Sequence, residues 1–144
     1  MELVEVFLVR RALCGIEPTG LHAVFKKLWE DCAGNVTVEK AKSAIKSHTT
    51  VTWPGDDFVK ERVQTRKLYG TTICKYFILE YDLSLGGDQP KDVPHVEHVM
   101  PQSRKQWADI VSSEEHKRYL HTAANLLPLS KKMNETVSSK AQAS

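Results

Sequence analysis

The stretch HVEHVMPQ, residues 95–102, decides the fold of this chain of 144 residues, because the character of the sequence changes there. Residues 93–100 contain several β-branched side chains and are followed by a proline, which predicts a short strand. The stretch NLLPL, residues 125–129, predicts a second short strand. We therefore expect an α+β fold, with a mainly helical subdomain over residues 1–89 and a smaller module over residues 90–144.

The helical subdomain is expected to hold five helices. The clearest one spans residues 21–32, with Thr19 as its N-cap and Gly34 just beyond its end. Asp56 or Asp57 is expected to cap a later helix. The five helices are expected at residues 3–13, 21–32, 38–47, 57–68 and 71–83.

A polar, turn-rich stretch, LGGDQP at residues 85–90, marks the expected boundary between the two parts. Beyond it, short helices are expected at residues 107–110 and 113–119. A final helix is expected at residues 131–143, after the second strand.

The composition indicates a soluble protein with a real core. Of the residues, 41% are hydrophobic, and no run is long and apolar enough to span a membrane. The N-terminus has no signal-peptide pattern, so we expect a cytoplasmic protein. Cys14, Cys32 and Cys74 lie among apolar neighbours without a C-x-x-C pair, which favours core residues over a zinc cage or a disulfide. The net charge of +2 predicts that duplex affinity is modest or partly supplied by another domain.

The residues that could carry chemistry lie in the last third of the chain. Glu97 and His98 are adjacent on the expected strand, so their side chains point to opposite faces. A carboxylate suits Mg²⁺, and an imidazole can take a proton from water near neutral pH. Asn134 could add a neutral oxygen to the same ion. Spacing alone leaves a purely structural role for these residues open.

Competing catalytic motifs are incomplete in this sequence. The H-E-x-x-H motif of zinc proteases is absent. Residues 95–97 match the H-x-E of zinc deaminases, but the P-C-x-x-C that completes that motif is missing. The sequence also has no G-x-S-x-G, Walker A or dinucleotide fingerprint.

A resemblance adds to this reading of the residues. The set formed by VEHVMPQ (residues 96–102), Trp107, NLLPL (residues 125–129), Asn134 and Lys140 is similar to the HNH domain at the C-terminus of GmrSD-type, modification-dependent restriction enzymes. The first half of this set, around residues 96–102, and the second half, around residues 125–134, form together a pattern that is more specific than either half alone.

The earlier part of the chain also resembles that family. The stretches concerned are FLVRRALCG at residues 7–15, GLHAVF at residues 20–25 and WPGDDF at residues 53–58. They are similar to its helical lead-in, so the resemblance covers nearly all of the chain. It implies that the C-terminal module has the ββα-metal (HNH, or His-Me finger) fold: two antiparallel strands and a helix around one divalent ion.

The resemblance also implies roles for individual residues. His98 matches the general base that deprotonates the attacking water, and Glu97 matches the acidic metal ligand. Asn125 matches the middle asparagine, which fixes the loop between the strands and helps to hold the histidine. Asn134 matches the last motif position, where asparagine can replace histidine as a metal ligand. The implied cofactor is Mg²⁺ or another divalent cation such as Mn²⁺.

The sequence departs from the family pattern at two positions. Ala124 stands where the family usually has glycine, and Ser139 where many members have asparagine. Candidate DNA contacts are His121, Lys131, Lys132 and Lys140. For His95 and His121 an ordinary polar surface role remains open, and Lys140 could equally be a solvated charge.

The expected function is a Mg²⁺-dependent DNA endonuclease or nickase domain of a restriction or anti-phage defence protein. The alternatives are a catalytically silent HNH-like module that binds DNA or protein, and a nuclease that acts on RNA. The family implies a partner, an N-terminal sensor module coupled to nucleotide hydrolysis. Because this chain resembles no such module, we expect a fragment or a separately encoded subunit. The oligomeric state stays open, and one possibility is a homo-oligomer in which each protomer cuts one DNA strand.

Overall fold

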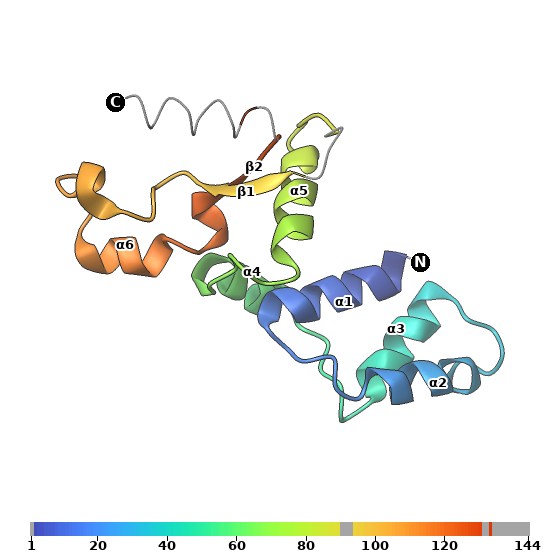
Figure 1. Cartoon of the computed structure of the whole chain (residues 1–144). Coiled ribbons are helices and arrows are strands. Elements are labelled where there is room, and N and C mark those ends of the chain that lie inside the picture. Colours follow the sequence, from blue (N-terminus) through green and yellow to red (C-terminus); the bar gives the residue numbers. More distant parts are fainter. Residues whose placement is uncertain (1, 90–93, 131–132, 134–144) are drawn as a thin grey trace. The chain divides into compact units, whose positions relative to one another are not determined.

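The computed structural model describes residues 2–89, 94–130 and 133. Its contacts divide the chain into two compact units, Met1–Arg62 and Val63–Ser144. The helices and strands labelled in Figure 1 confirm an α+β chain that is mainly helical. With the two 3-10 helices η1 and η2, which Figure 1 does not label, the elements in chain order are α1 (Glu2–Cys14), α2 (Leu21–Asp31), α3 (Val38–Ser47), α4 (Asp56–Thr65), α5 (Cys74–Ser84), β1 (His95–His98), η1 (Arg104–Trp107), α6 (Ser113–Tyr119), η2 (Ala123–Asn125) and β2 (Leu126–Leu129).

The first unit has a core built from three helices and the segment after them. Phe7, Val24 and Ile45 are completely buried. The ring of Trp53 stacks on Phe7 with centroids 4.9 Å apart, and Phe25 meets Phe7 edge-on at 6.5 Å. Burying side chains of this size stabilises a fold by roughly 1.5–3 kcal/mol each.

The ends of two helices in this unit correct the sequence expectations. Thr19 is not the N-cap of α2; Gly20 takes that position with φ 83°, a left-handed conformation that glycine adopts without a Cβ clash. Asp56 does not cap α4 from outside but lies in its first turn, where its carboxylate pairs with Arg10. α3 begins where expected because Thr37 Oγ1 accepts a hydrogen bond from the Lys40 amide.

The second unit holds the predicted pair of strands. β1 and β2 run antiparallel, with His98 opposite Leu126 and Glu97 opposite Leu127. α5, which contains the buried Ile78, packs against both strands. The chain divides into its compact units after Arg62, whereas the predicted subdomain boundary is at residue 89.

Three other expected helices can be compared with the structure. α6 covers the expected residues, but α5 begins at Cys74, three residues late, after a turn in which the Thr71 amide donates to the Leu68 carbonyl at 3.1 Å. The helix expected at residues 107–110 is wrong in position, because the 3-10 turn of η1 ends at Trp107. The final helix expected at residues 131–143 lies outside the described residues, apart from Met133.

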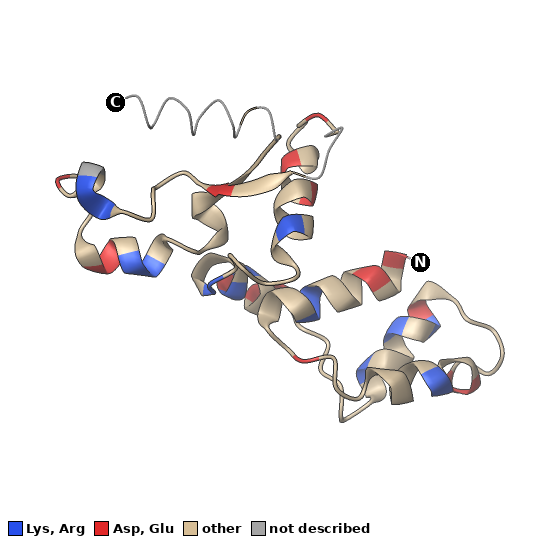
Figure 2. Cartoon of the chain, viewed as in Figure 1, with Lys and Arg blue, Asp and Glu red and all other residues tan. Residues whose placement is uncertain are grey.

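The charges and cysteines of the described residues agree with their expected roles. Figure 2 shows Lys and Arg interspersed with Asp and Glu along the helices rather than gathered into one stripe. Cys14, Cys32 and Cys74 are all buried, as expected of core residues. Within the described part of the chain, the search for a helix able to cross a membrane found no candidate.

Candidate active site

Asn125 fixes the backbone just after β1. Its side-chain Oδ1 accepts a hydrogen bond from the Met100 amide at 2.6 Å. Its Nδ2 donates to the Met100 carbonyl at 3.1 Å and to the Leu120 carbonyl at 2.8 Å. The Asn125 carbonyl accepts a further bond from the Val99 amide at 3.0 Å. Asn125 is only 6% exposed, and making its three side-chain bonds requires a neutral side chain with one acceptor and two donor hydrogens.

His98 is the last residue of β1, two residues before Met100, whose backbone Asn125 holds. Its Nε2 lies 3.0 Å from Nδ1 of His121, within hydrogen-bonding distance. The ring of Tyr69 lies 4.3 Å from the ring of His98, centroid to centroid, and stacks on His121 at 5.6 Å with an interplanar angle of 15°. Three rings from three segments of the chain therefore meet at His98.

The loop that carries Tyr69 is tied to His121 through the backbone. The amides of Leu68 and Tyr69 both donate to the His121 carbonyl, at 2.8 and 3.1 Å. A third histidine, the buried His116, contacts the segment that follows β1. One of its ring nitrogens lies 2.9 Å from the Pro101 carbonyl. These bonds place the rings of His98, His121 and Tyr69 on backbone that is itself fixed.

Both histidines of the pair are less basic than usual. Burial lowers the pKa of His98 from 6.5; the neighbouring His121 lowers it further, while Glu97 acts in the opposite direction. Burial also lowers the pKa of His121, and Lys67 and His116 add to the effect. Near neutral pH the two rings are therefore uncharged, and one donates a hydrogen bond to the other.

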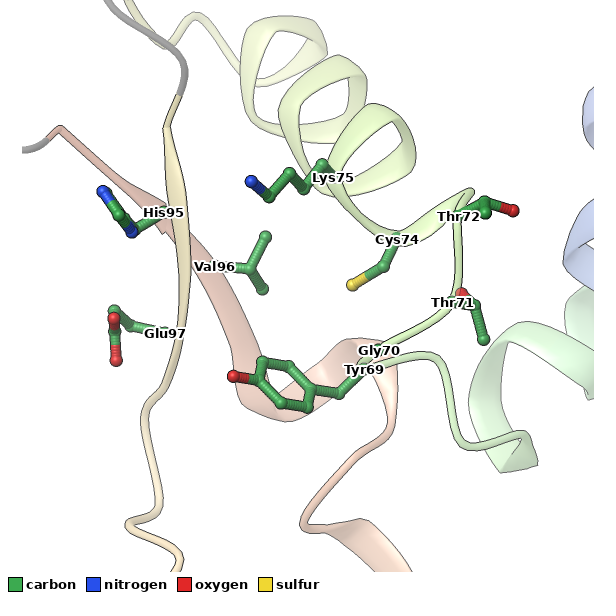
Figure 3. Close-up of a pocket in the computed structure, with 9 residues that line it drawn as sticks. All are labelled: Tyr69, Gly70, Thr71, Thr72, Cys74, Lys75, His95, Val96 and Glu97. Atoms are coloured by element: carbon green, nitrogen blue, oxygen red, sulfur yellow. The ribbon is translucent and has the colours of Figure 1, made fainter.

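Glu97 lies on the other face of the hairpin, since successive side chains of a strand alternate. Figure 3 shows Glu97 and His95 on one side of β1 and Val96 on the opposite side, pointing toward Cys74. Within the described residues, the Glu97 carboxylate has no hydrogen-bond or ion-pair partner. Such a carboxylate is chemically suited to a hard divalent cation.

A cavity of about 490 Å³ lies between β1 and the start of α5. Its lining includes Tyr69 from the site and Lys75 from α5 (Figure 3). Cys74 also lines it, and burial raises the pKa of this thiol, so that it stays protonated. The polar residues Lys75, His95 and Glu97 and the ring of Tyr69 therefore line the cavity, and it holds no nucleophilic thiolate at Cys74.

Part of the predicted site lies outside the described residues. Asn134, Lys131, Lys132 and Lys140 all fall there. Over residues 2–89, 94–130 and 133, no group of three or more His, Cys, Asp or Glu side chains is arranged to hold a metal ion. The structure thus brings together His98, Asn125 and His121, and metal binding by Glu97 with Asn134 stays a prediction.

The comparison with protein families matches residues 53–144 to GmrSD restriction endonucleases, C-terminal domain. The chain belongs to this family. The match covers more than half of the GmrSD-type chain, including both strands and the motif residues, so the resemblance to the C-terminal domain of GmrSD-type restriction enzymes is confirmed. The HNH character of the domain stays a prediction. The similarity expected for residues 7–15 and 20–25 lies outside the matched part. No curated protein and no solved structure was found to match the chain.

Sequence reasoning missed two residues of this GmrSD-type site. Tyr69 contributes a ring to the histidine pair from a loop in the predicted helical subdomain, about thirty residues before β1. His116 holds the Pro101 carbonyl from α6. Neither carries a motif signal, because each is brought to the site by the chain fold alone. His121, expected as a DNA contact or a surface residue, contacts His98; a contact of His121 with DNA stays a prediction.

Proposed function

We propose that this GmrSD C-terminal domain is the metal-dependent DNA endonuclease or nickase of a restriction system that defends against phage. The observation that carries the proposal is the clamp of Asn125 on the backbone of Met100, two residues after His98. An asparagine that immobilises the loop beside a histidine is the role the HNH pattern assigns to its middle residue. The antiparallel pairing of β1 and β2 supports the ββα-metal fold for this module.

His98 is proposed as the general base. Its lowered pKa leaves the imidazole uncharged at neutral pH, with a lone pair that can take a proton. The oxygen of the deprotonated water attacks phosphorus in line, and the bond from phosphorus to the 3′ oxygen breaks. The 3′ oxygen leaves and takes up a proton from solvent, which gives a 5′-phosphate and a 3′-hydroxyl.

Glu97 and Asn134 are proposed to hold one Mg²⁺ or Mn²⁺ ion. An ion held by these two residues would supply charge stabilisation where negative charge builds on the phosphate and the leaving oxygen. Glu97 fits this role because its carboxylate has no other partner among the described residues and lies on the hairpin face opposite His98. One side of β1 would then hold the cation while the other holds the base.

DNA is proposed as the substrate, with Lys131, Lys132 and Lys140 as phosphate contacts. The net charge of +2 is small, and duplex binding depends strongly on the number of neutralised phosphates. We therefore propose that an N-terminal sensor module or subunit of the same system supplies further affinity.

Cleavage of supercoiled plasmid tests the proposal directly. The full chain should cut with Mg²⁺ and stop cutting with EDTA, and His98→Ala should lose about 10²–10⁴-fold in rate. No cutting by the intact chain, or equal cutting by His98→Ala, would overturn it. DNA binding without metal-dependent cutting would indicate a catalytically silent module, and a parallel RNA substrate would reveal a ribonuclease.

A further inference from the structure

We infer that His121 is the positioning residue of His98, and that its Nδ1 accepts a hydrogen bond from Nε2–H of His98. The inference rests on the proposed function, in which His98 is the general base. It is an alternative to the sequence-based prediction that His121 contacts DNA. Its first observation is the distance of 3.0 Å between His98 Nε2 and His121 Nδ1.

The direction of this hydrogen bond decides whether His98 can act as a base. A neutral imidazole carries one N–H and one lone pair. If His121 donated, the lone pair of His98 would be occupied at Nε2 and its Nδ1 would carry the hydrogen. If His98 donates, its Nδ1 keeps a free lone pair for the proton of water. A working base therefore requires His121 in the tautomer protonated at Nε2.

The hydrogen bond from His98 to His121 also stabilises His98 after it has taken up the proton of water. Protonated His98 keeps its Nε2–H directed at His121 Nδ1, and a hydrogen bond from a charged donor is roughly twice as strong as a neutral one. His121 thus acts on the imidazole of His98 as an orienting acceptor, without touching the phosphate. This division of roles follows the general rule that a base is oriented by a third group.

The surroundings of His121 are built to hold its ring still. Its carbonyl accepts the two amides of Leu68 and Tyr69, and the ring of Tyr69 stacks on its imidazole. The next residue, Thr122, is almost completely buried and donates its hydroxyl to the Tyr119 carbonyl at 2.9 Å. An ordinary surface histidine has no such support, which argues for a defined orientation.

Two substitutions separate the hydrogen bond from simple packing. His121→Leu removes the acceptor and keeps a side chain of similar bulk. His121→Asn keeps an acceptor, since Oδ1 of asparagine is as many bonds from the backbone as Nδ1 of histidine. In plasmid cleavage by the full chain, His121→Leu should lose about 10–100-fold in rate with unchanged affinity for DNA. His121→Asn should recover most of that rate, and His22→Leu, at an exposed position, is the matched control.

A spectroscopic measurement makes the test independent of activity. In the intact chain labelled with ¹⁵N-histidine, NMR should show His98 protonated at Nε2 and free at Nδ1, with peaks assigned by their loss in His98→Ala. A His98 protonated at Nδ1 would overturn the inference, as would cutting by His121→Leu at the intact rate while His98→Ala is inactive. If His121→Leu cuts at the intact rate while His98→Ala is inactive, the inference fails but the proposed function stands. If the intact chain does not cut, both the inference and the proposed function fail.

Discussion

The side-chain amide of Asn125 hydrogen-bonds both sides of one residue, Met100, accepting from its amide at 2.6 Å and donating to its carbonyl at 3.1 Å. Because these two residues are 25 positions apart, the contact closes the long connection between the strands. The contact also fixes the path of the backbone from His98 to Met100. The candidate base at the end of β1 therefore lies just before a backbone segment that Asn125, the residue preceding β2, holds in place.

Asn125→Ala should destabilise the second unit by about 3 kcal/mol, because it leaves the buried Met100 amide without an acceptor. Asn125→Asp should also destabilise it, since a carboxylate oxygen would face the Met100 and Leu120 carbonyls in place of the donating Nδ2. Urea unfolding checks both variants. Asn35→Ala, at an exposed position, should stay within about 0.5 kcal/mol of the intact chain. An equally small effect for Asn125→Ala would contradict the clamp.

Ser112→Ala should lower stability by about 1 kcal/mol without changing the rate of DNA cutting. Ser112 Oγ accepts from the Glu115 amide at 3.2 Å, and the Glu115 carboxylate accepts from the Ser112 amide at 3.0 Å, which forms a capping box at the start of α6. The measurement pairs thermal unfolding with plasmid cleavage. Unchanged stability would show that α6 does not depend on its cap.

Stability should fall as the pH is lowered through the range just below 6.5. The folded chain holds the pKa of His98 and of His121 below that ordinary value, so the unfolded chain binds more protons there. The contribution of these groups is complete above 6.5 and is lost as the pH falls toward their lowered values. Urea midpoints between about pH 7.5 and about pH 5 should decline less steeply in a His98→Gln, His121→Gln variant. A slope equal to that of the intact chain would argue against buried, neutral rings.

Glu97→Gln should raise the concentration of Mg²⁺ needed for cutting while leaving the fold intact. The substitution removes the charge but keeps the shape, and hard cations depend on carboxylate charge. Titration calorimetry with Mn²⁺ measures the loss of affinity without reference to cleavage. Glu114→Gln, at an exposed position of α6, is the matched control and should bind as the intact chain does. Equal affinity of Glu97→Gln and the control would exclude Glu97 as a ligand.

Local patterns in the sequence predicted much of the fold. α3 and α6 begin and end at the expected residues, because Thr37 and Ser112 cap them with side-chain oxygens. The two strands follow from a stretch with β-branched residues and from a proline that tolerates an edge position. The predicted N-cap of α2 is wrong by one residue, because Gly20 adopts a left-handed conformation and takes the cap position itself.

The site was only partly predictable. Asn125 and His98 belong to a motif and were expected to lie together, which the hydrogen bonds around Met100 support. The contacts of Tyr69 and His121 with His98 depend on how distant segments meet, and no spacing rule reports such contacts. The cavity beside β1 depends likewise on where α5 begins.

A crystal structure of the full chain soaked in Mn²⁺ tests the central claim most directly, because the anomalous signal locates the ion without any assumption about activity. The account predicts one ion bound by the carboxylate of Glu97 and the side chain of Asn134, with the imidazole of His98 turned toward a water beyond it. An ordered Asn134 remote from Glu97, with no ion at that carboxylate, would contradict it.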